Sequence, residues 1–349
     1  MLLEDDAAQH SSCYFLASAE NATAKQVCTM VNEGRGVICA PISESRARLL
    51  GLYRMATQGL PQSPDFYVSI EARQGVTTGI SAEDRATTLQ TFVRSSNAKR
   101  DLVAPGHIFP LRAKEGGVLV RSAPAEAAVD LLALANCAPV AALCQCLDEK
   151  GHLASNAHLK AIHDRLQIPV IKISEIIRHR LVHERIIEKI AESSLPVRGA
   201  GTFRAFCFRS KIDGAEHLAL VRGNPSTGDG AKPTLIRVQA ESPLGDLLGI
   251  DGGKSRERIH TALGRIGAED SGIFVYIRHP HRSVLKPSNK EAPKSSEEGS
   301  APMLLREFGI GAQILRELGA KKVRLLSNSS REIPGVNAFQ IEIVERVSF

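Results

Sequence analysis

A loop rich in glycine, threonine and serine, residues 75–81, is the segment best suited to bind an anion. It precedes a predicted helix, and the free backbone N–H groups at a helix N-terminus favour negatively charged ligands. Its candidate donors are Thr77, Thr78 and Ser81, and further charge or donors come from Arg85, His107 and Arg112. These residues predict binding of a phosphate group. The alternative is that they only shape the fold, which is favoured for His107.

Cysteine and histidine residues are the other candidates for metal or redox chemistry. The seven cysteines are Cys13, Cys28, Cys39, Cys137, Cys144, Cys146 and Cys207, an odd number whose spacings give no disulfide framework. Cys144 and Cys146 fall on one face of a predicted strand, where two small packing residues are the favoured interpretation. His279, His281 and His260 could bind a metal, because imidazole is a common ligand; a surface His-Pro-His is favoured.

Composition limits the class of protein. The chain has 349 residues, of which 43% are hydrophobic, enough for two packed domains. The net charge of +6 is spread along the chain and fits a small anionic ligand such as a sugar phosphate or nucleotide. Without a dense basic stripe, and with 4% aromatics, nucleic-acid binding is not expected. No apolar run reaches membrane-spanning length and no basic-then-apolar leader opens the chain, so we expect a reduced cytoplasmic protein.

The elements that must position these residues alternate between strands and helices in the first half of the chain. Predicted strands cover residues 37–41, 66–70, 139–144 and 169–173, and predicted helices cover 43–50, 125–135 and 156–167, with others beginning at 81 and 174. Ser81 is a predicted helix cap, and Asp84 stands where a capping box has its acid.

A change of pattern at residues 193–201, with Ser-Ser-Leu-Pro and Gly-Ala-Gly, predicts a domain boundary. Beyond it, predicted strands are 203–209, 217–222, 235–238, 273–277, 322–326 and about 339–344, with helices at 255–266 and 310–318. Residues 287–301 are polar and contain proline, which predicts a mobile loop at about 283–302. We therefore expect an α/β (α+β) fold of two domains, 1–194 and 195–349, each a mixed sheet packed with helices.

Four motifs in the first half resemble those of the 3,4-dihydroxy-2-butanone-4-phosphate synthase family. They are Gly75-Val-Thr-Thr-Gly-Ile-Ser-Ala-Glu-Asp-Arg-Ala86, Pro105-Gly-His-Ile-Phe-Pro-Leu-Arg112, Glu126-Ala-Ala-Val-Asp130 and Gly36-Val-Ile-Cys39, in unbroken order over about residues 15–190. The resemblance implies conversion of ribulose 5-phosphate to a four-carbon ketone phosphate and formate. Magnesium would stabilise the enediol and carboxylates would move protons.

The chain departs from that family at its metal and proton-transfer positions. The family's acidic loop, Asp-Arg-Glu-Asn-Glu-Gly-Asp, falls on residues 8–14, where the metal-binding glutamate becomes His10. The metal-binding histidine falls on Pro124 and a late glutamate falls on Gln145. Asp5 and Asp6 remain acidic near the terminus, and Met1 falls inside a strand of the family.

Motifs in the second half are similar to GTP cyclohydrolase II over about residues 198–346. They are Gly201-Thr-Phe-Arg-Ala205, Glu216-His-Leu-Ala-Leu-Val221, Arg237-Val-Gln-Ala-Glu-Ser-Pro-Leu-Gly-Asp246, Gly309-Ile-Gly-Ala-Gln-Ile-Leu315 and Leu325-Leu-Ser-Asn328. The resemblance implies ring opening of guanine by a water on a zinc ion that three cysteines hold.

The zinc-binding cysteines are replaced in this chain by Ser242, Gly253 and Ser255. Arg306 matches an arginine of the family that contacts the nucleotide phosphate, whereas an acidic neighbour becomes Leu304 and a late lysine becomes Glu332. Zinc is therefore not expected.

Loss of ligands in two independent sites predicts a catalytically impaired, phosphorylated-ligand-binding or regulatory relative of the fused riboflavin-biosynthesis proteins. No cofactor is then expected. The alternative is an active synthase with a rebuilt magnesium site, with His10, Asp5, Asp6, His107 and Glu126 as its candidate groups, and a dead cyclohydrolase domain. A third possibility is a structural partner of an active enzyme. Because the synthase family is homodimeric, we expect a homodimer or pairing with an active paralogue.

Overall fold

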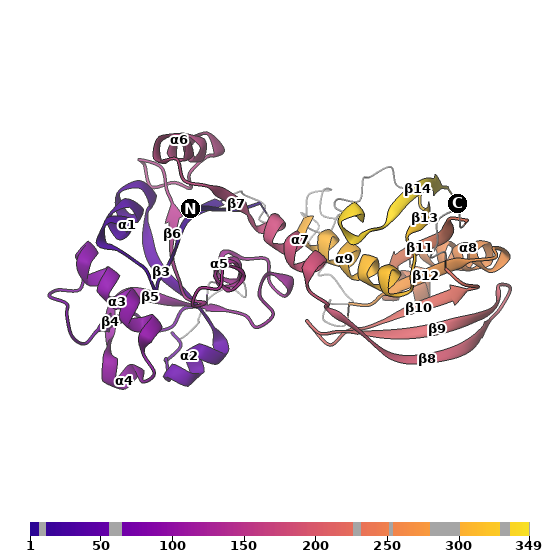
Figure 1. Cartoon of the computed structure of the whole chain (residues 1–349), viewed down its shortest axis with the longest axis horizontal. Coiled ribbons are helices and arrows are strands. Elements are labelled where there is room, and N and C mark those ends of the chain that lie inside the picture. The colour runs from indigo at the N-terminus through magenta and orange to yellow at the C-terminus, as the bar shows by residue number, and fades with distance from the viewer. Residues whose placement is uncertain are drawn as a thin grey trace. The chain divides into compact units, whose positions relative to one another are not determined.

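The chain divides into two compact units, Met1–Ile177 and Arg178–Phe349 (Figure 1). The computed structural model describes residues 1–6, 12–55, 65–225, 232–250, 254–279, 301–328 and 336–348. Each unit is built on one mixed sheet, with seven strands among the described residues, and carries helices. This confirms the expected α/β architecture of two mixed sheets.

The first unit has the strand order β4-β5-β3-β6-β2-β1-β7. Its strands are β1 (Leu2–Asp5), β2 (Ser12–Ser18), β3 (Arg35–Ser43), β4 (Ile70–Ala72), β5 (Leu102–Ala113), β6 (Ala141–Cys146) and β7 (Val170–Lys172). Two pairs, β3–β5 and β1–β7, are parallel and the others are antiparallel. Its helices are α1 (Ala24–Thr29), α2 (Glu44–Leu50), α3 (Ala82–Arg94), α4 (Ala98–Asp101), α5 (Pro124–Leu134) and α6 (Asn156–Leu166), and α7 (Ile173–His183) begins in it.

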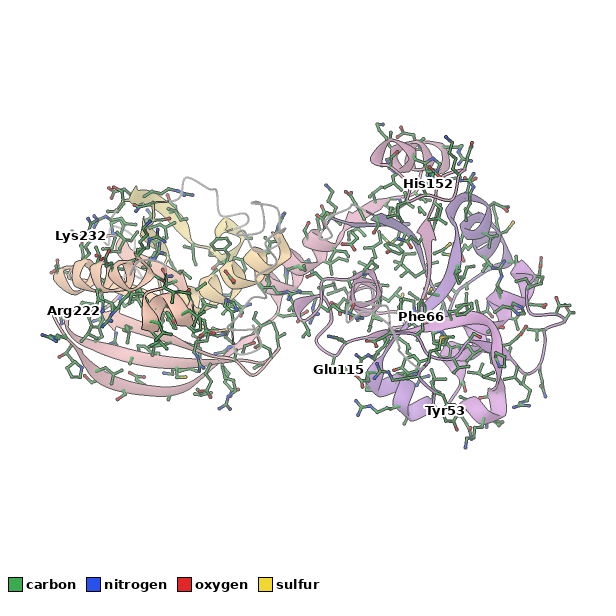
Figure 2. All side chains as sticks on the ribbon, turned by 180° about the vertical axis from the view of Figure 1, so that it is seen from behind. Tyr53, Phe66, Glu115, His152, Arg222 and Lys232 are labelled. Carbon is green, nitrogen blue, oxygen red and sulfur yellow. The ribbon has the colours of Figure 1, made fainter. Side chains whose placement is uncertain are left out.

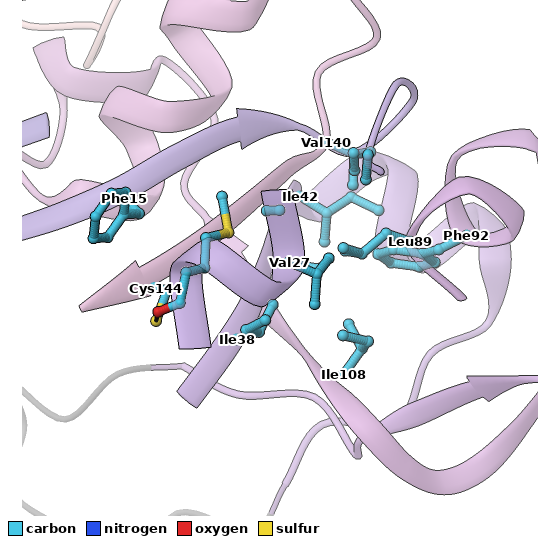
Figure 3. Packing of buried hydrophobic residues seen from close by; sticks show 14 of the residues in the cluster. Phe15, Val27, Ile38, Ile42, Leu89, Phe92, Ile108, Val140 and Cys144 are labelled. Carbon is cyan, nitrogen blue, oxygen red and sulfur yellow. Dashed lines mark hydrogen bonds between the residues drawn. The ribbon is translucent and has the colours of Figure 1, made fainter. Parts of the chain in front are cut away.

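The core of the first unit lies between this sheet and α1 and α3 (Figure 3). Leu89 and Phe92 on α3 are fully buried, and they pack with residues of the sheet such as Ile38, Ile108 and Cys144. Since aromatic residues are few, aliphatic side chains supply most of this packing, as the composition indicates.

Local sequence explains where the helices begin, with one correction. Ser43 and Ser81 cap α2 and α3, accepting hydrogen bonds from the backbone N–H groups of Arg46 (3.3 Å) and Asp84 (3.0 Å). The Asp84 carboxylate, however, accepts hydrogen bonds from the loop before the helix and not from the backbone of the cap residue.

The strand predicted at 66–70 is largely absent: β4 begins at Ile70. Phe66 pairs with Leu111 and Tyr67 with Arg54, so these two residues bridge different partners and form no continuous ladder.

The second unit has the strand order β14-β13-β11-β12-β10-β9-β8. Its strands are β8 (Ile187–Val197), β9 (Gly201–Ser210), β10 (Glu216–Arg222), β11 (Thr234–Ala240), β12 (Gly272–Ile277), β13 (Lys322–Leu326) and β14 (Glu342–Val347). The helices α8 (Lys254–Ala268) and α9 (Ala301–Glu317) belong to it. Ala262 and Ile266 of α8 are fully buried and pack with Phe203, Phe274 and Leu326 of the strands.

Three sequence-based boundaries differ from the structure. The boundary predicted after residue 194 falls inside β8, which pairs with β9 through Val197 and Gly201, so the second unit begins earlier, within α7. Of the loop predicted at 283–302, residues 283–300 lie outside the described part of the chain, and α9 begins at Ala301 rather than at residue 310. The last strand begins at Glu342, after a short 3₁₀ turn. Across the described residues, no helix combines the length and apolarity needed to span a bilayer.

We predict that Leu89→Ala lowers the free energy of unfolding by about 2–5 kcal/mol, because it opens a cavity among fully buried side chains. Leu49→Ala, on α2 at 71% exposure, is the matched control and should change it by less than about 0.5 kcal/mol. Urea unfolding measures both variants. Equal midpoints for the two would show that Leu89 is not a core residue.

Candidate functional site

The first unit contains a cavity of about 520 Å³, which we call the Tyr14 cavity, with a mainly apolar wall. This volume lies in the range of small-molecule sites in proteins. The wall comes from β3, β5, β6 and the segments beside them, with side chains that include Val37, Phe66, Leu111, Leu143 and Leu147. Phe66 is labelled in Figure 2, where it lies beside β5.

Tyr14, Pro124 and Gln145 all line this cavity. Tyr14 on β2 stands directly opposite Gln145 on β6, so their side chains leave the sheet on the same face. Pro124 is the first residue of α5, where its fixed φ and missing N–H suit a helix start. Pro124 and Gln145 are two positions where the sequence differs from the synthase motifs. The structure brings them together with Tyr14, the last residue of the segment 8–14.

The polar groups around the Tyr14 cavity are neutral or already paired. Burial raises the pKa of the Tyr14 hydroxyl, and burial raises the pKa of Cys39 to about 12, so both keep their protons at neutral pH. Arg121 donates from Nε to Oε1 of Glu126 over 2.6 Å, and its Nη1 lies 3.8 Å from Asp65. Because the Glu126 side chain is fully buried, this ion pair holds the guanidinium in place.

Arg112, a predicted phosphate donor, is engaged in an internal ion-pair network. It donates to Oδ2 of Asp65 over 2.7 Å and to Oε2 of Glu44 over 3.0 Å. Arg54 adds a second cation to Asp65 over 2.6 Å. Partial burial would raise the pKa of Asp65, but hydrogen bonds and charge from Arg112 and Arg54 lower it below its ordinary value.

One of the anion-binding donors predicted in residues 75–81, Thr77, is bonded to a carboxylate of the protein itself. Asp84 accepts from the Thr77 hydroxyl over 2.8 Å and from the Gly79 N–H over 2.9 Å. Ser81 caps α3, and Thr78 is exposed. An internal anion therefore takes the place expected for phosphate at Thr77 and Gly79.

His107 and Arg85 lie apart from the residues that line the Tyr14 cavity. The Nδ1 atom of His107 is 3.3 Å from Oε2 of Glu71, which fits the favoured structural role. A Cβ atom at Gly79 would fall 1.1 Å from Oε1 of Glu71, so this position, with φ of +82°, requires glycine. Arg85 is half-buried, and burial lowers its pKa.

In the second unit, two of the predicted zinc positions meet at one carboxylate. Asp246 accepts from the Ser242 N–H over 2.8 Å, from the Ser255 hydroxyl, and from the Tyr276 hydroxyl over 2.5 Å. Burial and the hydrogen bond to Asp246 raise the pKa of Tyr276. The third position, Gly253, lies outside the described residues, as does His10 of the first unit.

The remaining sequence-predicted residues form no metal centre in the part of the chain that the structure describes, where no three potential ligand side chains converge. His279 lies 3.0 Å from Glu307, and His260 is exposed on α8. Arg306 lies half-buried in α9, to which Leu304 also belongs. His281 and Glu332 lie outside the described residues. Of the acidic candidates near the terminus, Asp5 is buried and Asp6 accepts from the Ser174 N–H over 3.1 Å.

Comparison with known proteins shows the family to which the chain belongs. Residues 1–179 match the model for 3,4-dihydroxy-2-butanone 4-phosphate synthase, and residues 188–348 match that for GTP cyclohydrolase II. The chain belongs to the bifunctional riboflavin-biosynthesis family. It is 38% identical to the riboflavin biosynthesis protein RibBA of Bacillus cereus (strain ATCC 14579) over 98% of this chain and 88% of the relative. RibBA of Bacillus cytotoxicus is similar to the same extent, at 38% identity.

A solved structure is similar over the whole chain. It is that of RibBX, described as a two domain 3,4-dihydroxy-2-butanone 4-phosphate synthase from A. baumannii, with a TM-score of 0.80 and 29% identity over 100% of this chain and 94% of that one.

The residues present do not fit the metals that the riboflavin-biosynthesis family implies. Zinc takes thiolate, imidazole or carboxylate ligands, and of the groups that meet near Ser242 and Ser255 only Asp246 is of that kind. Magnesium takes oxygen ligands, mostly carboxylates, whereas the described lining of the Tyr14 cavity contains no carboxylate. No step of chemistry is therefore derived through either metal.

Sequence reasoning missed several residues of these sites. Asp246 closes a matched motif and Tyr276 lies on a predicted strand, but their hydrogen bond joins residues far apart in the chain. Arg121 precedes Pro124 closely and was a detectable cation. Tyr14 was passed over because its meeting with Gln145 depends on strand pairing.

We predict that Asp246→Ala lowers the free energy of unfolding by about 1–3 kcal/mol, because the donors from Ser242, Ser255 and Tyr276 lose their acceptor. Asp270→Ala is the control, since that side chain is 93% exposed and should change stability by less than about 0.5 kcal/mol. Thermal and urea unfolding measure both variants. Stabilisation of the wild type by added zinc would contradict the assignment of this cluster as metal-free.

Proposed function

We propose that this chain is a non-catalytic member of the riboflavin-biosynthesis family, which binds a ligand or regulates an active relative. The observation that carries the proposal is the Tyr14 cavity. Its polar lining is Tyr14, Cys39, Arg121 and Gln145, and none of these supplies a free base or a carboxylate at neutral pH.

The synthase reaction requires a group that removes a proton from a sugar phosphate and a cation that stabilises the enediol. The Gln145 amide does not accept a proton near neutral pH, Pro124 has no side-chain donor or acceptor, and the Tyr14 hydroxyl remains protonated. Residues 7–11 and 56–64, which lie outside the described part of the chain, contain neither aspartate nor glutamate, and His10 is their one titratable residue.

The cyclohydrolase reaction requires water activated by zinc. Hydroxyl groups at Ser242 and Ser255 are poor zinc ligands, and the Asp246 carboxylate already accepts three hydrogen bonds. The chemistry of this donor set supports the proposed loss of this activity.

The partners we propose follow from the family and from the charge of the chain. A homodimer, or a pair with an active paralogue, would let the chain act without chemistry of its own; a monomer in light scattering at micromolar concentration would argue against the homodimer. A phosphorylated ligand remains a proposal. Since Thr77, Ser81 and Arg112 already make internal hydrogen bonds, we propose that other donors and cations would bind it.

A second candidate function is an active synthase with a rebuilt site and an inactive second domain. The similarity of the whole chain to RibBX, a two domain synthase, favours it. The two candidates differ in one measurable product, formate.

We predict that the purified full-length chain releases no formate from ribulose 5-phosphate in the presence of Mg²⁺, because the described lining of the Tyr14 cavity contains no free base. With GTP and Zn²⁺, it should likewise release none. RibBA of Bacillus cereus, assayed at equal concentration, is the comparison for both reactions. A bacterium lacking the synthase should not grow without riboflavin when it carries this gene and makes soluble protein. Formate from ribulose 5-phosphate would establish the second candidate in place of the first.

A further inference from the structure

The wall of the Tyr14 cavity is suited to a flat apolar molecule. Phe66 lines it, and its ring packs edge-to-face on Phe109 with ring centroids 6.4 Å apart, which fixes the orientation of that aromatic surface. Leu143 and Leu147 add aliphatic surface. Apolar surface of this kind is favourably removed from water by an apolar ligand.

The charge in the cavity is unsuited to a phosphate. Among the described residues of its lining, Arg121 alone carries a formal charge. That guanidinium is bonded to the buried Glu126 carboxylate over 2.6 Å and also donates to the Arg112 carbonyl over 2.9 Å. A phosphate would have to give up its hydration and face Glu126 and Asp65 behind the arginine, which is costly without new donors.

The polar edge of the cavity is neutral. The Tyr14 hydroxyl both donates and accepts hydrogen bonds, and the Gln145 side chain offers an amide donor and a carbonyl acceptor. Strand pairing holds the two residues opposite each other, so they form one short polar edge on an otherwise apolar surface.

We propose that the Tyr14 cavity binds an uncharged fused-ring heterocycle, with its ring face against Phe66 and the aliphatic wall and its hydrogen-bonding edge toward Tyr14 and Gln145. This inference rests on the proposed function, because a working synthase site would have to admit a charged sugar phosphate. The ligand class that we infer for the Tyr14 cavity is a neutral ring system and not a phosphorylated sugar.

The test uses lumichrome, an uncharged three-ring heterocycle, as the probe in equilibrium dialysis against the full-length chain. We expect saturable binding that ribulose 5-phosphate at equal concentration does not displace. Absence of saturable binding, or displacement by ribulose 5-phosphate, would overturn the proposal.

Two variants locate the binding. Val37→Trp should fill the cavity and weaken lumichrome binding at least about tenfold, and it should leave the core intact because Val37 is 59% exposed. Leu49→Trp introduces the same side chain at a position that is 71% exposed and does not line the cavity, and should bind as the wild type does. Equal binding by both variants would place the probe elsewhere and overturn the assignment.

A third variant tests the requirement for a neutral edge and does not add bulk. Gln145→Glu should weaken lumichrome binding as the pH rises and the new carboxyl group ionises, whereas the wild type should show no such trend between pH 5 and 8. Binding by Gln145→Glu that is independent of pH would contradict the assigned edge.

The formate assay separates the two proposals. Absence of both formate release and lumichrome binding would remove only the ligand assignment, whereas formate release would remove the proposed function itself.

Discussion

The antiparallel pairing of β2 with β6 is the contact on which the candidate site depends. It sets Tyr14 opposite Gln145, and because side chains alternate between the two faces of a strand, it also sends Cys13, Phe15, Cys144 and Cys146 into the core. A shift of register by one residue would exchange these two sets. The close approach of β3 reinforces the arrangement, since a Cβ atom at Gly36 would fall 2.4 Å from the Gln145 carbonyl oxygen.

Three carboxylates of the protein accept hydrogen bonds close to residues that the sequence analysis singled out. Asp84 accepts a hydrogen bond from the loop that was predicted to bind phosphate, residues 75–81. Glu126 forms an ion pair with Arg121, and Asp246 accepts hydrogen bonds near the predicted zinc positions. A buried carboxylate is costly unless donors surround it, so the bonds to Asp84 and Glu126 stabilise these two buried groups.

Much of the fold could be predicted from sequence where the signal is local. The Ser81 cap marks the start of α3, and the apolar periodicity of residues 156–166 marks α6. The sequence analysis predicts no strand for β2, β5 or β8, and β8 is exposed along most of its length and is defined by pairing with β9. The role of Asp84 differs from the predicted one because two sets of donors can reach its carboxylate. A capping box would use the Ser81 backbone N–H, whereas the structure uses Thr77 and Gly79, and the sequence does not distinguish the two. The positions of Pro124 and Gln145 came from the resemblance, whereas their meeting at one cavity required the tertiary structure.

The Asp246 cluster also affects how the chain can evolve. Regaining three thiolates would require changes at residues 242, 253 and 255, and a metal site with one or two of them would bind zinc poorly. Ser255→Cys taken alone exchanges a strong hydroxyl donor to Asp246 for a weak thiol donor, so stability falls before any metal is gained. A first step toward a zinc site at Ser255 is therefore disfavoured, because it weakens a hydrogen bond that the second unit already uses.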